Sequence, residues 1–271
     1  MPFDSEIFPE SSFLLETHRF YASLIGFASS TSDSDNEPSL GGKLLYGGAL
    51  DVQGRALAVA GNIAGAATLT ATVETSAQKQ AIRDGVVDFL VTSLDEALRI
   101  LKNEIRKRET VAVCVSAAPA NLERQMTERG VLPDLIFGGL PGAARNSTGF
   151  GASATRFHLN DADESETYLT WKIEEAPAKW MPKLDALAID CLGATPWEAR
   201  WLRLAPRYCG RPAQGVRVLH CDAQVAKQIM KSIANAVEQR EVGVQVRISA
   251  IVDGQSFTAL HSPPIERKSA R

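Results

Sequence analysis

The sequence lacks several features that would assign it quickly to a class of protein. Its 271 residues include 29 Lys and Arg against 32 Asp and Glu, so no positive excess draws it to nucleic acid or an acidic membrane. No apolar run approaches the roughly 20 residues that a helix needs to cross a bilayer. The first ten residues, MPFDSEIFPE, are acidic and lack the cationic start of a signal peptide. We therefore expect a cytoplasmic protein without nucleic-acid or membrane partners.

Metal and disulfide signatures are missing too. The chain has four cysteines, none in a CxxC pair, and four scattered histidines without an HExxH cluster. In a cytosolic protein these cysteines are reduced thiols, and no structural zinc site is expected. The composition is 45% hydrophobic, enough for the core of one large domain or two small ones.

Predicted strands and helices alternate from Gly54 to residue 137. The most regular helix covers 93–108, where Ser93 and Glu96 form a capping box and leucines recur on one face. Such alternation predicts an α/β fold, a Rossmann-like and mostly parallel sheet flanked by helices. The expected strands are 56–61, 86–91, 111–117 and 134–137, and the expected helices are 62–83, 93–108 and 121–130.

The rest of the chain suggests a division into segments. A polar turn between alternating residues in 155–175 predicts a small β-hairpin insertion. The N-terminal helix has an apolar face without an evident core partner, which favours a homodimer formed through it. The expected segments are an N-terminal helix and polar linker (1–40), the first part of the Rossmann-like domain (41–149), the β insertion (150–180), the second part of that domain (181–262) and a tail (263–271).

One glycine-bearing stretch, ALAVAGNIAG (56–65), resembles a strand running into a helix. A dinucleotide site needs glycines at that turn and a helix N-terminus facing the pyrophosphate. It also needs an acid at the end of the second strand, about 20 residues on. The candidate cofactor residues are therefore Gly61, Asn62 and Gly65, with Gly138 and Gly139 at a later strand end. The alternative is a turn whose small residues only let a helix pack closely on a strand.

If the turn at 56–65 bound a dinucleotide, no acidic residue would stand where the ribose hydroxyls are expected. The expected second strand ends in Val91-Thr92-Ser93, and Glu74 comes too early. The loop 138–144 carries no side chain that forms hydrogen bonds. Without a ribose acid and without donors in this loop, we expect no NAD or weakly bound NAD.

Several stretches resemble the urocanase (urocanate hydratase) family. They are LYGGALDVQGRALAVAGNIAGAATLTAT (45–72), RDGVVDFLVTSLDEAL (83–98) and ERGVLPDLI (128–136). A weaker similarity covers 186–235, where Cys191-Leu-Gly-Ala-Thr-Pro-Trp197 has the spacing of the family's active-site cysteine segment. The resemblance implies addition of water to urocanate, with bound NAD⁺ as the electrophile and Cys191 as a catalytic residue.

Cys191 also follows an apolar run, LDALAID, so we expect it at the carboxyl end of a strand, where ligands of α/β proteins bind. Three functions remain open. The first is a divergent urocanase-like module that has lost hydration and binds a small molecule or assists assembly. The second is an active urocanate-hydratase-like lyase that uses NAD. The third is a cysteine-dependent enzyme acting through Cys191.

Overall fold

The computed structural model describes residues 11–31, 37–138, 150, 154–159, 167–193, 196–252 and 255–264. The chain divides into two compact units. The parallel-sheet unit comprises Leu15–Asp161 with Arg207–Arg211, and the antiparallel-sheet unit comprises the remainder. Among the described residues, no helix combines the length and apolar character needed to span a bilayer.

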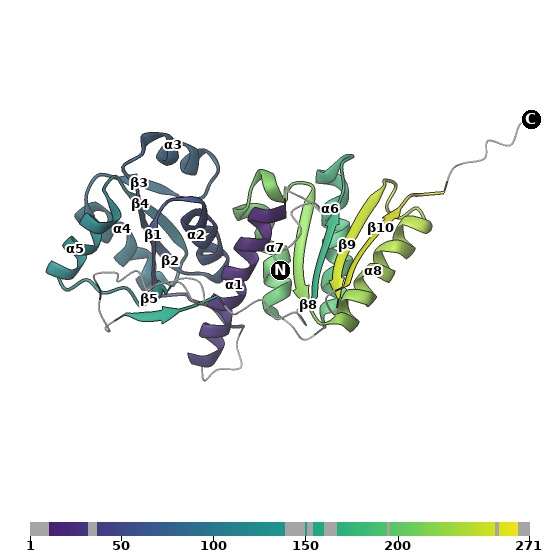
Figure 1. The fold of residues 1–271 in the computed structure, drawn as a ribbon, viewed down its shortest axis with the longest axis horizontal. Helices are drawn as coiled ribbons and strands as arrows, with labels where there is room; N and C mark the ends of the chain where they lie inside the picture. Colours follow the sequence, from purple (N-terminus) through teal and green to yellow (C-terminus); the bar gives the residue numbers. More distant parts are fainter. Residues whose placement is uncertain are drawn as a thin grey trace, which may run out of the picture. The chain divides into compact units, whose positions relative to one another are not determined.

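The parallel-sheet unit is a six-stranded sheet in the order β3-β4-β2-β1-β5-β6, with every neighbouring pair parallel. Helices α4 and α5 cover one face, and α2 packs on the other (Figure 1). Its elements are α1 (Ser12–Thr31), β1 (Leu44–Ala49), α2 (Val52–Ala64), β2 (Ala67–Ala71), α3 (Thr75–Arg83), β3 (Phe89–Val91), α4 (Leu94–Lys107), β4 (Val111–Val115), α5 (Pro119–Glu128), β5 (Leu135–Phe137) and β6 (Thr155–Phe157). The predicted α/β fold with a Rossmann-like parallel sheet is confirmed.

Local signals predicted the later half of this sheet well. The Ser93 hydroxyl accepts a hydrogen bond from Glu96 N at 3.3 Å, so the capping box starts α4 as expected. All five residues of β4 are buried, as a central parallel strand requires. These elements show where sequence pattern and tertiary environment agree.

The first predicted strand is a helix. Ala56–Gly61 lies inside α2, and the first strand is β1, about ten residues earlier. Every α2 residue from Ala56 to Ala64 is buried, so this helix has no polar face to reveal a helical period. Alanine is also the strongest helix former, which favours the helix once its surroundings are apolar.

The antiparallel-sheet unit has four strands in the order β10-β9-β7-β8. Helices α6 and α8 pack together beside this sheet (Figure 1). Its elements are β7 (Thr167–Lys172), α6 (Pro177–Leu192), α7 (Pro196–Tyr208), a 3₁₀ turn (Arg211–Ala213), β8 (Val216–Cys221), α8 (Ala223–Glu238), β9 (Val246–Val252) and β10 (Gln255–His261). Residues 181–262 therefore do not form a second part of the Rossmann-like sheet, because their strands pair in a sheet of their own.

The predicted β insertion also differs from the structure. β6 pairs in parallel with β5, whereas β7 pairs antiparallel with β8 and β9. The two strands expected to form one hairpin thus belong to different sheets. The hairpin β9–β10 is present, with Val252 opposite Gln255, although Asp253 and Gly254 lie outside the described residues.

The N-terminal helix buries the apolar face that suggested dimerisation. Phe20, Tyr21 and Leu24 have no exposed surface, and the Phe20 ring packs edge-on against Phe137 at 5.0 Å between centroids. The argument for a dimer through this face no longer holds, because the face is already covered within the chain.

Candidate functional site

The glycines singled out from the sequence lie at the wrong edge of the sheet. Gly61 and Asn62 belong to the last turn of α2, and Gly65 ends that helix with a φ of 93°. Gly65 thus precedes β2, at the amino edge of the parallel strands, whereas ligands of such sheets bind at the carboxyl edge. The Asn62 side chain is buried and its Oδ1 accepts a hydrogen bond from the Thr110 hydroxyl at 3.3 Å, which is a packing role.

Small residues are nevertheless required there, because a Cβ at Gly61 would lie 2.6 Å from the Thr68 hydroxyl oxygen and 2.8 Å from a Leu45 methyl carbon. The sequence alternative of close helix-to-strand packing is therefore the one that the structure supports for Gly61. Gly65 supplies the left-handed conformation that ends a helix.

The strand-to-helix turn of this fold comprises the last residues of β1 and the two residues before α2, Gly47–Asp51. The register of β1 against β2 shifts between Tyr46 and Gly48, and Gly48 has a φ of 69°. A Cβ on Gly48 would meet nothing within 4 Å, so this turn is open. Gly54, in the first turn of α2, approaches β1 so closely that a Cβ there would lie 1.8 Å from the Ala49 carbonyl oxygen. These are the features of a nucleotide-type turn: a bend, an open backbone and a close helix contact.

An acid also stands at the end of the second strand. β2 ends at Ala71, and Glu74 follows it at the start of α3, 20 residues after Gly54. Glu74 is exposed, and its side chain does not cap α3. The expectation that no carboxylate occupies this position was wrong, because it rested on a wrong assignment of the first two strands. The correct signal was the pair Gly47-Gly48 followed by Asp51, a residue type that begins helices.

A carboxylate already occupies the helix N-terminus at this turn. Asp51 is the N-cap of α2, and its Oδ1 accepts a hydrogen bond from Gly54 N at 2.9 Å. In a dinucleotide site the pyrophosphate takes this position, because it needs the N–H groups of the first helical turn and the positive end of the helix dipole. The residues present therefore fit the nucleoside end of a dinucleotide better than its pyrophosphate.

The switch point of the sheet lies between β1 and β5, since the chain leaves β1 towards β2 on one side while β5 pairs on the other. Gly138 follows β5 at this carboxyl edge, and its N–H donates to the Phe157 carbonyl at 2.8 Å. A Cβ at Gly138 would lie 2.3 Å from the His158 ring, so the histidine packs directly on this glycine. Gly139, the other residue proposed here, lies outside the described residues.

Cys191 is not at a strand end. It lies in the last turn of α6, half-buried, because the run LDALAID is helical. Burial, and then the charge of Asp190, raise the pKa of its thiol, with the Ser232 hydroxyl acting in the opposite direction. The C-terminal end of a helix also disfavours a thiolate. In the described part of the chain, no three His, Cys, Asp or Glu side chains gather as a metal site would require.

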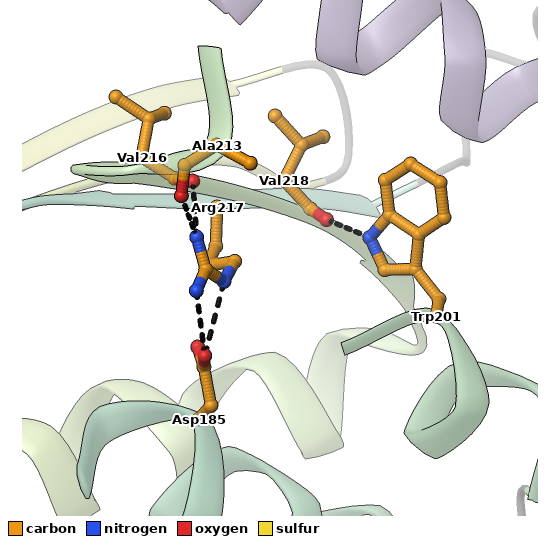
Figure 2. A network of polar contacts seen from close by, with 6 residues as sticks. All are labelled: Asp185, Trp201, Ala213, Val216, Arg217 and Val218. Carbon is orange, nitrogen blue, oxygen red and sulfur yellow. Dashed lines mark hydrogen bonds and ion pairs between the residues drawn. The ribbon is translucent and has the colours of Figure 1, made fainter. Parts of the chain in front are cut away.

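A buried ion pair dominates the polar interior of the antiparallel-sheet unit (Figure 2). Arg217 donates from Nη2 at 2.8 Å and from Nε at 3.1 Å to Asp185 Oδ2, and from Nη1 to the Ala213 and Val216 carbonyls. Burial raises the pKa of Asp185 to about 6, and the Arg217 charge opposes that rise. Both side chains lie in the interior, so we assign them a structural role.

The parallel sheet and its flanking helices define the parallel-sheet unit as a Rossmann-like α/β domain. A comparison with protein families identifies it further. Residues 23–138 match the model described as the urocanase Rossmann-like domain. This part of the chain is therefore a Rossmann-like domain of the urocanase family, as the resemblance of its motifs implied.

Proposed function

We propose that this urocanase-type domain no longer hydrates urocanate with NAD and instead serves as a small-molecule-binding or assembly module. The observation that carries the proposal is the Asp51 carboxylate on the first turn of α2. The scaffold of the family is retained, while the position for the cofactor's pyrophosphate holds a negative side chain.

The electrostatic cost is large enough to matter. Two unit charges about 4 Å apart repel by about 1 kcal/mol in bulk water and about 4 kcal/mol at an effective dielectric constant of about 20. Asp51 is exposed, so the cost lies near the lower value. The Gly54 N–H donates to the Asp51 carboxylate and is therefore not available to donate to a phosphate oxygen. NAD would lose one charge-assisted hydrogen bond in this way. Together these effects predict a loss of at least tenfold in NAD affinity.

A second candidate is an NAD-dependent, urocanate-hydratase-like lyase. Glu74 favours it, because a carboxylate at the end of the second strand is the group that binds the ribose hydroxyls of a dinucleotide. In that case NAD would supply the electrophile, Glu74 would hold the ribose and the open backbone at Gly48 would admit the cofactor.

One set of measurements separates the two candidates. Mass spectrometry of the purified full chain tests for retained NAD, calorimetric titration tests for added NAD, and loss of urocanate absorbance tests for hydration. We expect no retained cofactor, no urocanate turnover and weaker NAD binding by the wild type than by Asp51→Ser. Retained NAD that disappears in Glu74→Gln, or any turnover of urocanate, would establish the lyase instead.

A further inference from the structure

A groove on the parallel-sheet unit is lined by three cations, and among the residues that the structure describes no acid lines it, although Asp84 pairs with Arg55 beside it. It has a volume of about 800 Å³ and runs along one face of α3, with α2 contributing one residue from its first turn. The residues that line it through their polar side chains are Arg55, Thr75, Ser76, Lys79, Gln80 and Arg83. We call it the α3 groove. Three positive side chains therefore face one space in a protein whose formal net charge is −3.

The spacing of the α3 residues explains why they share this space. Positions 75, 76, 79, 80 and 83 lie on one side of a helix with 3.6 residues per turn. The distance along the helix axis from Thr75 to Arg83 is about 12 Å at 1.5 Å per residue. Hydroxyl donors stand at one end and a guanidinium at the other, with Lys79 between them. A ligand that uses the whole groove is therefore elongated and carries more than one anionic group.

A chain of hydrogen bonds fixes both arginines in place. Arg83 Nη2 donates to Gln80 Oε1 at 2.7 Å, and Gln80 Nε2 donates to Asp84 Oδ1 at 2.7 Å. The other oxygen of Asp84 accepts from Arg55 Nη2 at 2.5 Å. Burial acts to raise the pKa of Asp84, but hydrogen bonds from Gln80 and Arg55 outweigh it and lower that pKa. The carboxylate thus orients Arg55 directly and Arg83 through Gln80, so less conformational entropy is lost when a ligand binds.

We propose that the α3 groove is a binding site for a small phosphate-bearing molecule of the diphosphate class. Guanidinium groups match phosphate oxygens in bidentate geometry, and an ammonium group adds a mobile point charge. The first turn of α3 begins after the exposed acid Glu74, so the donors on which the site depends are the cationic side chains. The groove shares no residue with the Gly47–Asp51 turn, so this proposal does not depend on whether NAD binds there.

The test is calorimetric titration of the full chain with inorganic pyrophosphate at low ionic strength. We expect saturable one-site binding that is weaker for orthophosphate, since one phosphate engages fewer cations. Lys79→Gln and Arg83→Gln each remove an exposed charge and should raise the dissociation constant about tenfold. The matched control is Lys102→Gln, which removes one exposed charge from α4 outside the groove and should change the constant by less than about twofold.

The proposal is overturned if the wild type shows no saturation, or if Lys102→Gln weakens binding as much as Lys79→Gln does. Displacement of pyrophosphate by NAD would show that the groove accepts the diphosphate of NAD, and the urocanate and Asp51→Ser measurements would still decide the proposed function. Failure of the groove and failure of the proposed function are therefore separate results.

Discussion

The Asp51 carboxylate accepts a hydrogen bond from the backbone N–H of Gly54, at 2.9 Å, and so caps the N-terminus of α2 at the turn that follows β1. The two residues have different roles within one turn. Asp51 caps the helix, whereas Gly54 lets the helix lie against the end of β1. Substitutions at the two positions should therefore have separable effects.

Substitutions of Asp51 distinguish its cap from its charge. Asp51→Ser keeps an oxygen that can accept from the first turn, so the free energy of unfolding should change by less than about 0.5 kcal/mol. Asp51→Ala removes the acceptor and should cost about 1 kcal/mol. Denaturant unfolding followed by far-ultraviolet circular dichroism measures both. If both variants lost the same free energy of unfolding, the hydrogen bond from Gly54 N–H to residue 51 would not contribute to stability, and only the charge of Asp51 would.

Gly54→Ala should be strongly destabilising, by about 3 kcal/mol, because the added methyl group meets the Ala49 backbone rather than a movable side chain. The control is Gly26→Ala in α1, where a Cβ meets nothing within 4 Å. That change should stabilise the protein by roughly 0.5–1 kcal/mol, because alanine is the better helix former. Thermal unfolding of both variants gives the comparison, and a neutral Gly54→Ala would show that α2 lies farther from β1.

The Asp185–Arg217 pair predicts a particular dependence of stability on pH. The carboxyl has a pKa of about 6 in the folded chain and about 4 in the unfolded chain, so the folded state binds more protons between these values. The contribution of this group to the free energy of unfolding should therefore increase as the pH falls from 7 to 4, by about 1 to 3 kcal/mol. It is lost again as the pH rises through 6.

Tryptophan fluorescence can follow this effect in the right unit, because all four tryptophans of the chain lie at 171, 180, 197 and 201, within the antiparallel-sheet unit. Urea unfolding of wild type and Asp185→Asn at pH 7, 6, 5 and 4 isolates the contribution of the carboxyl. The variant resembles the protonated carboxyl, so it should be at least as stable as the wild type at pH 7 and should not gain this increment as the pH falls. The same pH profile in both proteins would assign the titration to other groups.

Cys191 should react slowly with thiol reagents. Its pKa is raised by burial and by Asp190, so little thiolate exists at neutral pH. Iodoacetamide labelling at pH 7, read by peptide mass spectrometry, should modify Cys191 no faster than a free cysteine peptide. Selective rapid labelling that a small molecule prevents would return this residue to the candidate catalytic groups.

The sequence predicted well those elements whose signals are local. Ser93 is a side-chain cap, and the structure shows its hydroxyl accepting a hydrogen bond from the first turn of α4. The predicted strand at 111–117 is an apolar run, and β4 covers 111–115 with every residue buried. Neighbouring residues suffice for such assignments, because the capping acceptor and its donors are within three positions of one another.

The glycine turn could not be located in the same way. Ala56–Gly61 is a short apolar run, which is compatible with a strand or with a fully buried helix. Only the packing of α2 against the sheet decides the matter, since burial on all sides removes the polar positions that show a helical period. Because this one element was predicted wrongly, the strand-to-helix turn was placed at Gly61–Gly65 instead of Gly47–Asp51. For the same reason Glu74 was not recognised as the acid that follows the second strand, β2.

By itself, the sequence determined the α/β class and the family of residues 23–138. It also showed that the chain has neither the positive charge excess of a nucleic-acid-binding protein nor the CxxC pairs of a zinc site. Each of these follows from composition or from motifs in which adjacent residues carry the information. The tertiary structure alone decided which glycines stand at the carboxyl edge, that residues 167–261 hold a separate antiparallel sheet, and that Arg55 joins Lys79 and Arg83 in one groove. Those relationships join residues that are far apart in the chain, and only the pairing of strands and the packing of helices bring them together.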